Sequence, residues 1–341
     1  MSKINDLAAE LRKLLATDLF PAGSRFLSEY EIENRYGISR ITANKAVSLL
    51  AAEGLLERGK RGSGTFVKKS SIFPKGWIAA IENLSTVYNT RVYAGAAQEA
   101  YAQGYVLAVL RPQTSGVADI LNNLKSSDCA GIIGFSSLLE MIPPDYPKTV
   151  IHLDGVLNSI ESKKRHSVTC ANRTAAYEMM TRIIAAGKKE IVCVGANYAG
   201  NRRERMDGFE AAMLDHNITD AARRRIAIHS GSAHEIKLAF SKIKKLFPKV
   251  DFIATDSDEV AYRIIKTAEA ENIDCPGSIG VSGFGNLPEV ASYCTIPTVD
   301  QHPWHIGVQA VKSLLDIVEK RTSGEIVQVE IPTEIINSEF I

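Results

Sequence analysis

A short segment near the amino terminus carries side chains suited to recognising nucleic acid. Helical spacing places five polar residues on one face of a helix, namely Arg40, Thr42, Asn44, Lys45 and Ser48. Guanidinium, ammonium, amide and hydroxyl groups of this kind hydrogen-bond to base edges and phosphates in a major groove. A solvated helix face would also be polar, so the helix alone leaves that alternative open.

A glycine-rich segment follows this helix. Residues 59–64 read Gly-Lys-Arg-Gly-Ser-Gly, with apolar residues on both sides. The pattern predicts a β-hairpin in which residues 55–58 pair with residues 65–67. Its glycines allow the backbone to approach DNA closely, while Lys60 and Arg61 supply positive charge. Such a tip is often a plain turn, but its position after the polar helix favours DNA binding.

Three helices must position these side chains. Apolar residues at helical spacing predict a first helix over residues 2–16. Ser28, with a glutamate three residues later, forms a capping-box pattern that begins a second helix over residues 28–36. Gly37 ends that helix, and the third begins near Ser39 after a short turn. The apolar face of the third helix consists of Ala43, Val47 and Leu50.

The remainder of the chain alternates between strand-like and helical runs. The apolar strand-like runs lie at residues 77–81, 105–110, 130–135, 149–153, 190–195, 251–255 and 278–284. Alternation of this kind is typical of βαβ units with parallel sheets. The predicted fold class is therefore α/β, with a helix-turn-helix domain in front of a larger domain.

Length and charge agree with this division. The 341 residues suggest about two domains. Residues 1–70 carry 12 Lys/Arg and 8 Asp/Glu, a net charge of +4, whereas the rest carry 28 and 31, a net charge of −3. The first residues lack the apolar run of a signal peptide, and no stretch approaches the roughly 18–20 apolar residues of a membrane span. We expect a cytoplasmic protein without membrane contact.

Other classes of protein fit the sequence less well. Residues 280–284 lack the second glycine of a nucleophile elbow, and no phosphate-binding loop motif occurs. His302 and His305 could suggest a metal pair, but polar residues at a helix start are favoured because no carboxylate motif accompanies them. The five scattered cysteines are expected to be buried hydrophobes rather than disulfides or metal ligands. We expect no enzyme activity and no cofactor. A free-standing solute-binding protein is also disfavoured, because such a protein would have no DNA-binding domain.

Residues 1–68 resemble the winged helix-turn-helix domain of the GntR regulator family. The matching strings are residues 21–29, 37–42, 53–55 and 62–67. The resemblance implies DNA contacts by the third helix and by the glycines of the wing. Tyr30 and Asn44 stand where the family often has arginine, and asparagine can pair bidentately with adenine, which implies a different operator sequence. The candidate DNA-binding residues are Arg25, Ser28, Tyr30, Ser39, Arg40, Thr42, Asn44, Lys45, Arg61, Gly62 and Gly64.

Residues 76–341 resemble the sugar-binding domain of LacI/GalR repressors, which has a periplasmic-binding-protein-like fold. The matching strings are residues 128–133, 150–154, 187–191, 202–209, 257–261, 279–284 and 286–309. Both domains together resemble arabinose-responsive repressors. The resemblance implies two α/β subdomains joined by three crossings, near residues 169, 300 and 326, with the effector in a cleft at the strand ends.

The same resemblance places six residues at the effector. They are Glu82, Phe135, Asp154, Arg205, Ser257 and Asn286. Arg205 matches an effector-clamping arginine, because a guanidinium offers paired donors to hydroxyls or a carboxylate, although a surface cation is the alternative. Asp154 could accept sugar hydroxyls or cap a turn. Gly285 and Asn286 replace a usual aspartate, for which Glu82 could compensate.

These features predict a sequence-specific transcriptional regulator, a repressor, whose operator affinity is controlled by a small molecule. The effector is expected to be a sugar, the alternative being a sugar acid or nucleoside. We expect a homodimer that binds two operator half-sites. Residues 1–68 would bind DNA, residues 76–341 would bind effector and dimerise, and residues 69–75 would form a loose linker that becomes ordered on DNA. The effector's identity, the operator and the sign of the response do not follow from the sequence.

Overall fold

The chain divides into two compact units, Met1–Pro74 and Lys75–Ile341. The computed structural model describes residues 3–15, 19–21, 23–60, 63–68, 75–82, 86–112, 116–135, 139, 142–143, 145–154, 164–196, 200–321 and 324–341. Most of the predicted linker, together with Arg61 and Gly62 of the predicted wing, lies outside the described residues.

The first unit is a helix-turn-helix with a hairpin. Its elements are α1 (Lys3–Leu15), α2 (Glu29–Tyr36), α3 (Arg40–Ala52), β1 (Leu56–Arg58) and β2 (Thr65–Val67). The predicted helices and hairpin are confirmed to within one residue at the bounds that the structure describes. Ser28 caps α2 in a complete capping box with Glu31, and Gly37 ends that helix in the left-handed region at φ 63°.

Apolar residues from all three helices form the core of this unit. Leu11 of α1, Ile32 of α2 and Val47 of α3 are all fully buried in one cluster. An ion pair between Arg12 and Glu53 joins α1 to the end of α3. The polar face of α3 is therefore held against a rigid apolar support.

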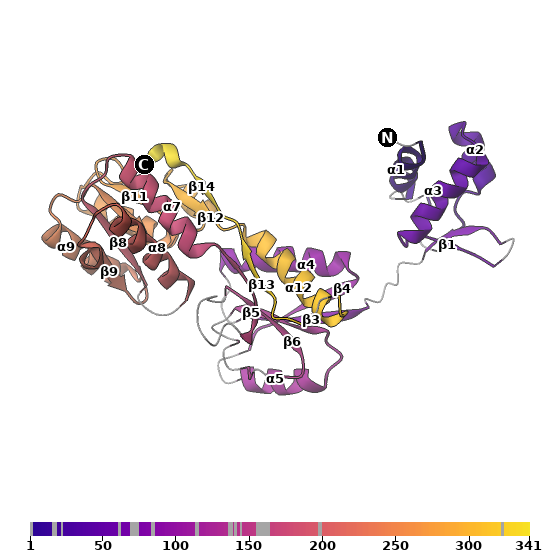
Figure 1. The fold of residues 1–341 in the computed structure, drawn as a ribbon, viewed down its shortest axis with the longest axis horizontal. Helices are drawn as coiled ribbons and strands as arrows, with labels where there is room; N and C mark the ends of the chain where they lie inside the picture. The colour runs from indigo at the N-terminus through magenta and orange to yellow at the C-terminus, as the bar shows by residue number, and fades with distance from the viewer. Residues whose placement is uncertain are drawn as a thin grey trace. The chain divides into compact units, whose positions relative to one another are not determined.

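The second unit contains the predicted alternation of strands and helices (Figure 1). Its first half comprises β3 (Gly76–Ile81), α4 (Val87–Ala102), β4 (Tyr105–Leu110), α5 (Val117–Ser126), β5 (Gly131–Phe135), β6 (Thr149–Leu153), β7 (His166–Cys170) and α7 (Asn172–Ala185). Its middle comprises β8 (Ile191–Ala196), α8 (Asn201–Asp215), η2 (Ala221–Arg224), β9 (Arg225–Ile228), α9 (Ala233–Leu246), β10 (Phe252–Thr255), α10 (Asp258–Ala270) and β11 (Gly280–Ser282). Its last part comprises α11 (Pro288–Ala291), β12 (Thr298–Asp300), α12 (Pro303–Val318), β13 (Gln328–Ile331), β14 (Glu334–Ile336) and η3 (Ser338–Phe340).

Two parallel sheets define two lobes. The first lobe holds six strands in the order β13-β7-β6-β5-β3-β4, and the second holds four in the order β11-β10-β8-β9. All strand pairs in both sheets are parallel. This confirms the predicted α/β class with parallel sheets. The strands β7, β9, β12, β13 and β14 were not among the predicted runs.

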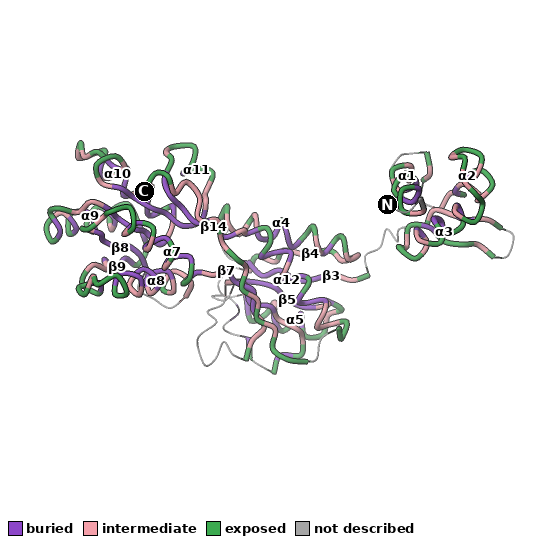
Figure 2. The backbone as a smooth tube through the Cα atoms, turned by 45° about the horizontal axis from the view of Figure 1, so that its top comes forward, coloured by how far each residue is buried: buried purple, intermediate pink, exposed green. Residues whose placement is uncertain are grey.

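Helices cover both faces of each sheet. In the first lobe Ile78 and Ala80 pack with the cluster that includes α4 and α12, while the alternate residues Ala79 and Ile81 pack with α5. In the second lobe α7 and α8 share a cluster with Ile191, and α9 and α10 cover the other face. Figure 2 shows the buried strands inside these layers and the exposed outer faces of the helices.

Three crossings join the lobes. The chain leaves the first sheet between β7 and α7, returns between β12 and α12, and leaves again between β13 and β14. The first two lie near the predicted residues 169 and 300. The third was predicted near residue 326 and instead follows Ile331, because β13 pairs with β7 as far as Cys170.

Two glycines allow close contacts between neighbouring helices. A Cβ on Gly307 of α12 would lie 1.8 Å from the Val92 carbonyl oxygen of α4, so only glycine allows this approach. A Cβ on Gly208 of α8 would similarly lie 2.3 Å from the Arg173 carbonyl oxygen of α7. The second contact fixes α8, the helix that carries Arg205.

Candidate functional site

The α3 helix presents the predicted polar face to solvent. Arg40, Asn44 and Lys45 are exposed, and Thr42 is half-buried. Ile41 on the same side is 71% exposed, an apolar side chain with no packing partner in the core. The face therefore offers cations and an amide around one apolar group, a combination that suits phosphates, base edges and thymine methyl groups.

Two of the candidate DNA-binding residues have local structural roles. The Ser28 hydroxyl accepts from the Glu31 amide at 3.2 Å and donates to the Glu31 carboxylate at 2.7 Å. Ser39 caps α3, with its hydroxyl 2.9 Å from that of Thr42. These hydroxyls hold the two helix starts, so any contact with DNA would be additional to capping.

A polar network joins α2, α3 and the hairpin. Arg58 of β1 donates to the Ser48 hydroxyl at 2.9 Å and forms an ion pair with Glu29 at 3.8 Å. The Asn44 amide donates to Glu29 at 3.4 Å. Arg58 and Glu29 were not among the predicted DNA-binding residues, although Glu29 ends the matching string at residues 21–29. Tyr30 is 62% exposed beside this network.

The base of the predicted wing is ordered around Arg25. The Arg25 backbone forms an isolated antiparallel bridge with Phe66. Gly64 has a φ of 95° and lies close enough that a Cβ would be 3.0 Å from Arg25 Nε. Because this conformation favours glycine, Gly64 allows the Arg25 side chain to lie across the hairpin.

In the second unit, Arg205 of α8 is a buried cation rather than a surface one. Its side chain is 6% exposed, and its guanidinium carbon lies 3.8 Å from the centroid of the Phe284 ring. Nε donates to Asn172 Oδ1 and Nη1 donates to the Asp256 carbonyl oxygen, both at 2.8 Å. Among the described residues, Nη2 makes no hydrogen bond. The guanidinium is thus held by two hydrogen bonds, and its Nη2 donors are not used within the described residues.

Asp154 faces this arginine from the first lobe. It follows β6 with a φ of 54°, and Tyr88 donates from its hydroxyl to Asp154 Oδ1 at 3.0 Å. Burial raises the pKa of Asp154 to about 6, against the opposing effects of the Arg205 charge and of hydrogen bonds from Tyr88 and Asn201. Asn201 begins α8, so this contact joins the lobes.

Tyr88, Asp154, Asn172, Asn201 and Arg205 form what we call the interlobe cluster. Asn201 Oδ1 is buried without a hydrogen-bond partner among the described residues. The cluster therefore combines an unpaired amide acceptor, a carboxylate and guanidinium donors in one place. Such a set can bind a molecule that both donates and accepts, as a hydroxyl group does.

Phe135 and Glu82 extend from this cluster along the first lobe. The Phe135 ring lies 6.1 Å from that of Tyr88 and 5.8 Å from that of Tyr93, measured between centroids. Glu82 is 2% exposed and pairs with Arg111 at 3.0 Å, while its Oε1 has no partner among the described residues. Glu82 and Tyr93 line a hollow of about 340 Å³ to which Phe135 does not contribute. Glu82 thus borders this hollow together with Tyr93 and Arg111.

Ser257 and Asn286 are occupied by other groups. The Ser257 hydroxyl caps α10 by accepting from the Val260 amide at 3.4 Å. The Asn286 amide donates to Asp300 Oδ2 at 2.9 Å. The structure therefore gathers Phe135, Asp154 and Arg205 but directs these two side chains to neighbouring backbone and carboxylate groups.

Sequence reasoning missed a fully buried carboxylate beside Arg205. Asp256 accepts from Arg202 through both oxygens, at 2.6 and 2.8 Å, and from the Ala196 amide at 2.6 Å. Its position directly after β10 was a signal, because polar residues at the carboxyl ends of parallel strands border ligand sites. Its contacts fix the start of α8.

The cysteines and histidines are the candidates for disulfide and metal sites in the described part of the chain. None of the five cysteines forms a disulfide, and four of them are buried. Among the described residues, no group of three or more His, Cys, Asp or Glu side chains is placed to hold a metal ion. No helix in those ranges has the length and apolar character needed to cross a bilayer.

Comparison with known proteins matches both units. Residues 3–67 match the bacterial regulatory proteins of the gntR family, and residues 180–338 match a periplasmic binding protein-like domain. The NTD biosynthesis operon regulator NtdR of Bacillus subtilis is 29% identical over 168 residues, which are 48% of this chain and 50% of that protein. The chain thus spans about half the length of this curated relative.

Solved structures show the same fold. The transcriptional regulator CelR in complex with cellobiose aligns over 98% of this chain and 97% of its own, with a TM-score of 0.66 and 15% identity. CcpA of Lactococcus lactis aligns over 77% of this chain and 97% of its own, with a TM-score of 0.66 and 17% identity. The chain therefore combines a helix-turn-helix domain that matches the gntR family model with a periplasmic-binding-protein-like domain that has the fold seen in LacI-family regulators.

Proposed function

We propose that this protein is a transcriptional repressor whose affinity for operator DNA is controlled by a sugar bound between the two lobes. The observation that carries the proposal is the interlobe cluster. Arg205 is held by hydrogen bonds to Asn172 and Asp256, while its Nη2 donors are not used within the described residues. Asp154 and the unpaired oxygen of Asn201 lie opposite. An unpaired buried acceptor costs folding free energy unless a ligand satisfies it.

The chemistry of the cluster favours a neutral polyhydroxyl ligand. Each sugar hydroxyl donates one hydrogen bond and accepts others, so a pair of adjacent hydroxyls can use guanidinium donors and carboxylate or amide acceptors together. The Phe135 and Tyr88 rings supply an apolar face for the carbon skeleton. A sugar acid could use Arg205 but would place its carboxylate near that of Asp154, so we rank it second.

The polar face of α3 supports the DNA-binding part of the proposal. Arg40 and Lys45 are exposed, and neither side chain has a partner among the described residues. A recognition helix of a helix-turn-helix enters the major groove with such side chains directed at bases and phosphates. The candidate contacts in the wing, Arg61 and Gly62, are proposed from the sequence alone.

We further propose that the repressor is a homodimer. The edge strand β4 of the first lobe exposes apolar side chains, Val106 at 47% and Val109 at 42%. Tyr101, just before this strand, is 83% exposed. Edge strands with exposed apolar residues are usually covered, and a second copy would cover this one.

Effector and operator would then be coupled through lobe orientation. Effector binding stabilises one arrangement of the lobes, and that arrangement changes the spacing of two DNA-binding units in a dimer. The coupling free energy in such systems is typically about 1–3 kcal/mol. A neutral sugar that hydrogen-bonds to the unpaired groups of the interlobe cluster would weaken operator binding by a free energy of that size.

A thermal-shift screen tests the proposal most directly. Neutral sugars, sugar acids and nucleosides would be added to the full chain, and a ligand of the interlobe cluster raises the melting temperature because it binds only folded protein. Each hit is then added to a gel shift with genomic operator fragments selected by the protein. A nucleoside as the single hit would contradict the sugar assignment, and selection of no fragment would contradict the regulator itself.

A further inference from the structure

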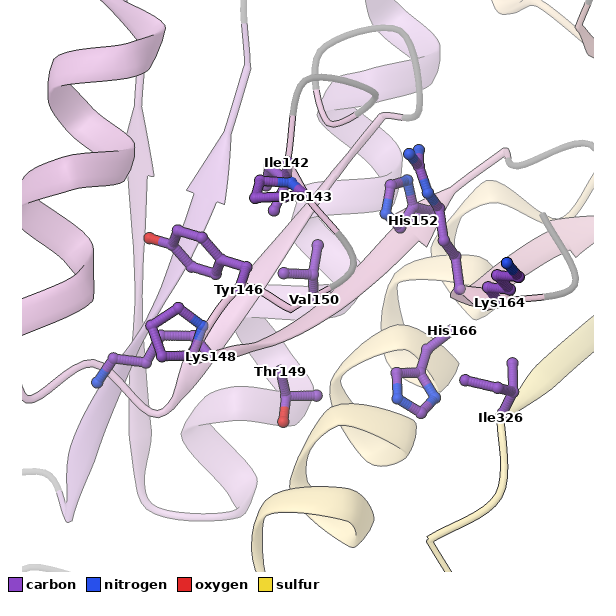
Figure 3. A pocket seen from close by; sticks show the side chains of 12 residues that line it. Ile142, Pro143, Tyr146, Lys148, Thr149, Val150, His152, Lys164, His166 and Ile326 are labelled. Atoms are coloured by element: carbon purple, nitrogen blue, oxygen red, sulfur yellow. The ribbon is translucent and has the colours of Figure 1, made fainter. Parts of the chain in front are cut away.

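The first lobe contains a second hollow, which lies beside the interior strands β6 and β7 (Figure 3). Its volume is about 370 Å³, which falls in the range of small-molecule sites. Five of its described lining residues have basic side chains, namely Lys148, His152, Lys164, Arg165 and His166, and no Asp or Glu is among the described residues that line it.

Two of the lining residues support the wall. The Lys148 ammonium donates to the carbonyl oxygens of Ser127 and Cys129, at 2.7 and 3.1 Å. Tyr146 donates from its hydroxyl to the Leu121 carbonyl oxygen at 2.6 Å. These contacts fix the turn that precedes β6, so the hollow has a built boundary on that side.

His166 provides a defined donor. Its Nδ1 accepts from the backbone amide of Val327 at 3.0 Å and therefore carries no proton. Burial lowers the pKa of His166, which keeps the ring neutral. The proton must then reside on Nε2, which is available to donate.

His152 lies close to the positive charge of the hollow. It is 5% exposed, and its pKa is lowered to about 4, first by burial and then by the positive charge of Arg165. Lys164 is exposed at the rim. Ser167 pairs in register with His152 across β6 and β7, and its buried hydroxyl has no partner among the described residues.

We propose that this hollow binds the phosphate group of a small phosphorylated metabolite. The described lining supplies the cations Lys164 and Arg165 and the neutral donor of His166, and it contains no Asp or Glu. This is the chemistry that recognises a compact anion. The volume of the hollow suits a molecule of small-metabolite size, and the Lys148 ammonium donates hydrogen bonds to the carbonyl oxygens of Ser127 and Cys129 on one wall. This site is independent of the interlobe cluster and does not rest on the proposed function.

Calorimetry on the full chain tests the assignment. The probes are inorganic phosphate, glucose 6-phosphate, citrate and, as an uncharged control, glucose. We expect both phosphate probes to bind, and Lys164→Gln or His166→Asn to weaken each by about tenfold, since a hydrogen bond to a charged group is lost. Asparagine keeps an acceptor for the Val327 amide, so His166→Asn removes the Nε2 donor with little effect on folding.

Two matched variants make the test specific. Lys242→Gln removes an exposed lysine of α9 in the other lobe and should leave phosphate affinity unchanged. Arg205→Ala should also leave it unchanged, whereas loss of glucose 6-phosphate binding in that variant would place the anion in the interlobe cluster and overturn the proposal. Absence of binding by both phosphate probes, or tighter binding of citrate, would overturn it as well.

Discussion

Tyr88 donates from its hydroxyl to Asp154 Oδ1 at 3.0 Å, joining the start of α4 to the end of β6. Burial raises the pKa of Tyr88 well above its usual value, so the phenol stays protonated and can serve only as donor to this carboxylate. One lone pair of Asp154 is thereby committed to the protein. The remaining acceptor capacity of Asp154 faces Arg205 and Asn201, whose effects on its pKa show their proximity.

The raised pKa of Asp154 predicts a pH-dependent stability. Its folded-state pKa of about 6 exceeds the usual 3.8, so the folded protein binds this proton more tightly than the unfolded chain does. The stabilising contribution is complete below pH 3.8 and is lost as the pH rises through 6. Asp154→Asn removes the cost of the buried charge, so its melting temperature should exceed that of wild type at pH 8, with a gap that narrows toward pH 4.

Melting curves from pH 4 to 8 check this prediction, with Asp145→Asn as the matched control. Asp145 is exposed, so its neutralisation should leave the curves of wild type and variant parallel. A wild-type advantage over Asp154→Asn at pH 8 would mean that Arg205 and Asn201 stabilise the carboxylate more than burial destabilises it.

Arg205 should be needed for effector response and not for operator binding. Removing it leaves the effector's acceptors and Asn172 unpaired, which typically costs about 2–5 kcal/mol of ligand affinity. Arg205→Ala should therefore bind operator normally yet fail to release it at effector concentrations that release wild type. Calorimetry measures the affinity, and gel shifts measure the release.

A neighbouring arginine provides the control for this variant. Arg203 lies on the same helix but is half-exposed and pairs with Asp207, so Arg203→Ala should keep both activities. Arg205→Lys retains charge without the planar fork and should recover folding more than affinity. Unchanged effector affinity in Arg205→Ala would show that the effector binds elsewhere.

Sequence patterns predicted the fold well because local signals were strong. The capping box at Ser28 and the left-handed Gly37 determine where α2 begins and ends, independently of tertiary context. Strands such as β6 are continuous apolar runs. β7, by contrast, reads His-Ser-Val-Thr-Cys, and it is a strand because β6 and β13 pair with both its edges. Non-local pairing of that kind leaves no local pattern.

The interlobe cluster could be predicted only in part. Asp154 and Arg205 lie in recognisable strings, whereas Tyr88 and Asn201 reach the cluster through helix starts that no motif marks. Glu82 was expected to compensate for the aspartate that Gly285 and Asn286 replace, and it lies with Tyr93 and Arg111 at a hollow of the first lobe. Which side chains meet across two lobes depends on lobe packing, and that information is spread over the whole chain.

Arg40 should contribute to sequence-specific DNA binding. A side chain that reads a base edge is worth about 1–3 kcal/mol, so Arg40→Ala should weaken operator binding by that amount and reduce discrimination against mutated sites. Gel shifts at several salt concentrations provide the measurement. Lys13→Ala on α1 is the control, since Lys13 pairs with Glu10 away from the polar face of α3. Wild-type affinity in Arg40→Ala would remove this residue from the interface.

The exposed edge of β4 should hold two copies together. Replacing Val106 with lysine puts a charge where a second copy would bury an apolar group, which favours the monomer. Sedimentation velocity should show a dimer for wild type and a smaller species for Val106→Lys. Leu238→Lys, at a side chain of α9 that is 59% exposed in the other lobe, tests whether any added lysine has this effect. A dimeric Val106→Lys would place the interface on another surface.

The Asp256 carboxylate should be the largest single polar contribution to the stability of the second lobe. It is fully buried and receives two hydrogen bonds from Arg202 and one from the Ala196 amide. Removing Asp256 leaves the buried Ala196 amide without an acceptor and leaves Arg202, whose side chain is 28% exposed, without its carboxylate, which should cost about 1–3 kcal/mol. Asp256→Ala should lower the free energy of unfolding by that amount in urea titrations of the full chain.

Asp207→Ala gives the contrast on which this last prediction depends. The Asp207 carboxylate also forms ion pairs with two arginines, Arg203 and Arg225. Its side chain is 29% exposed, so water can replace the carboxylate as the partner of both arginines once Asp207 is removed. Its removal should cost no more than about 1 kcal/mol. Equal losses in the two variants would mean that water reaches Asp256 as well. A loss confined to Asp256→Ala would instead support a dry ion pair that holds α8 at the end of β10 and, through α8, holds Arg205 in position.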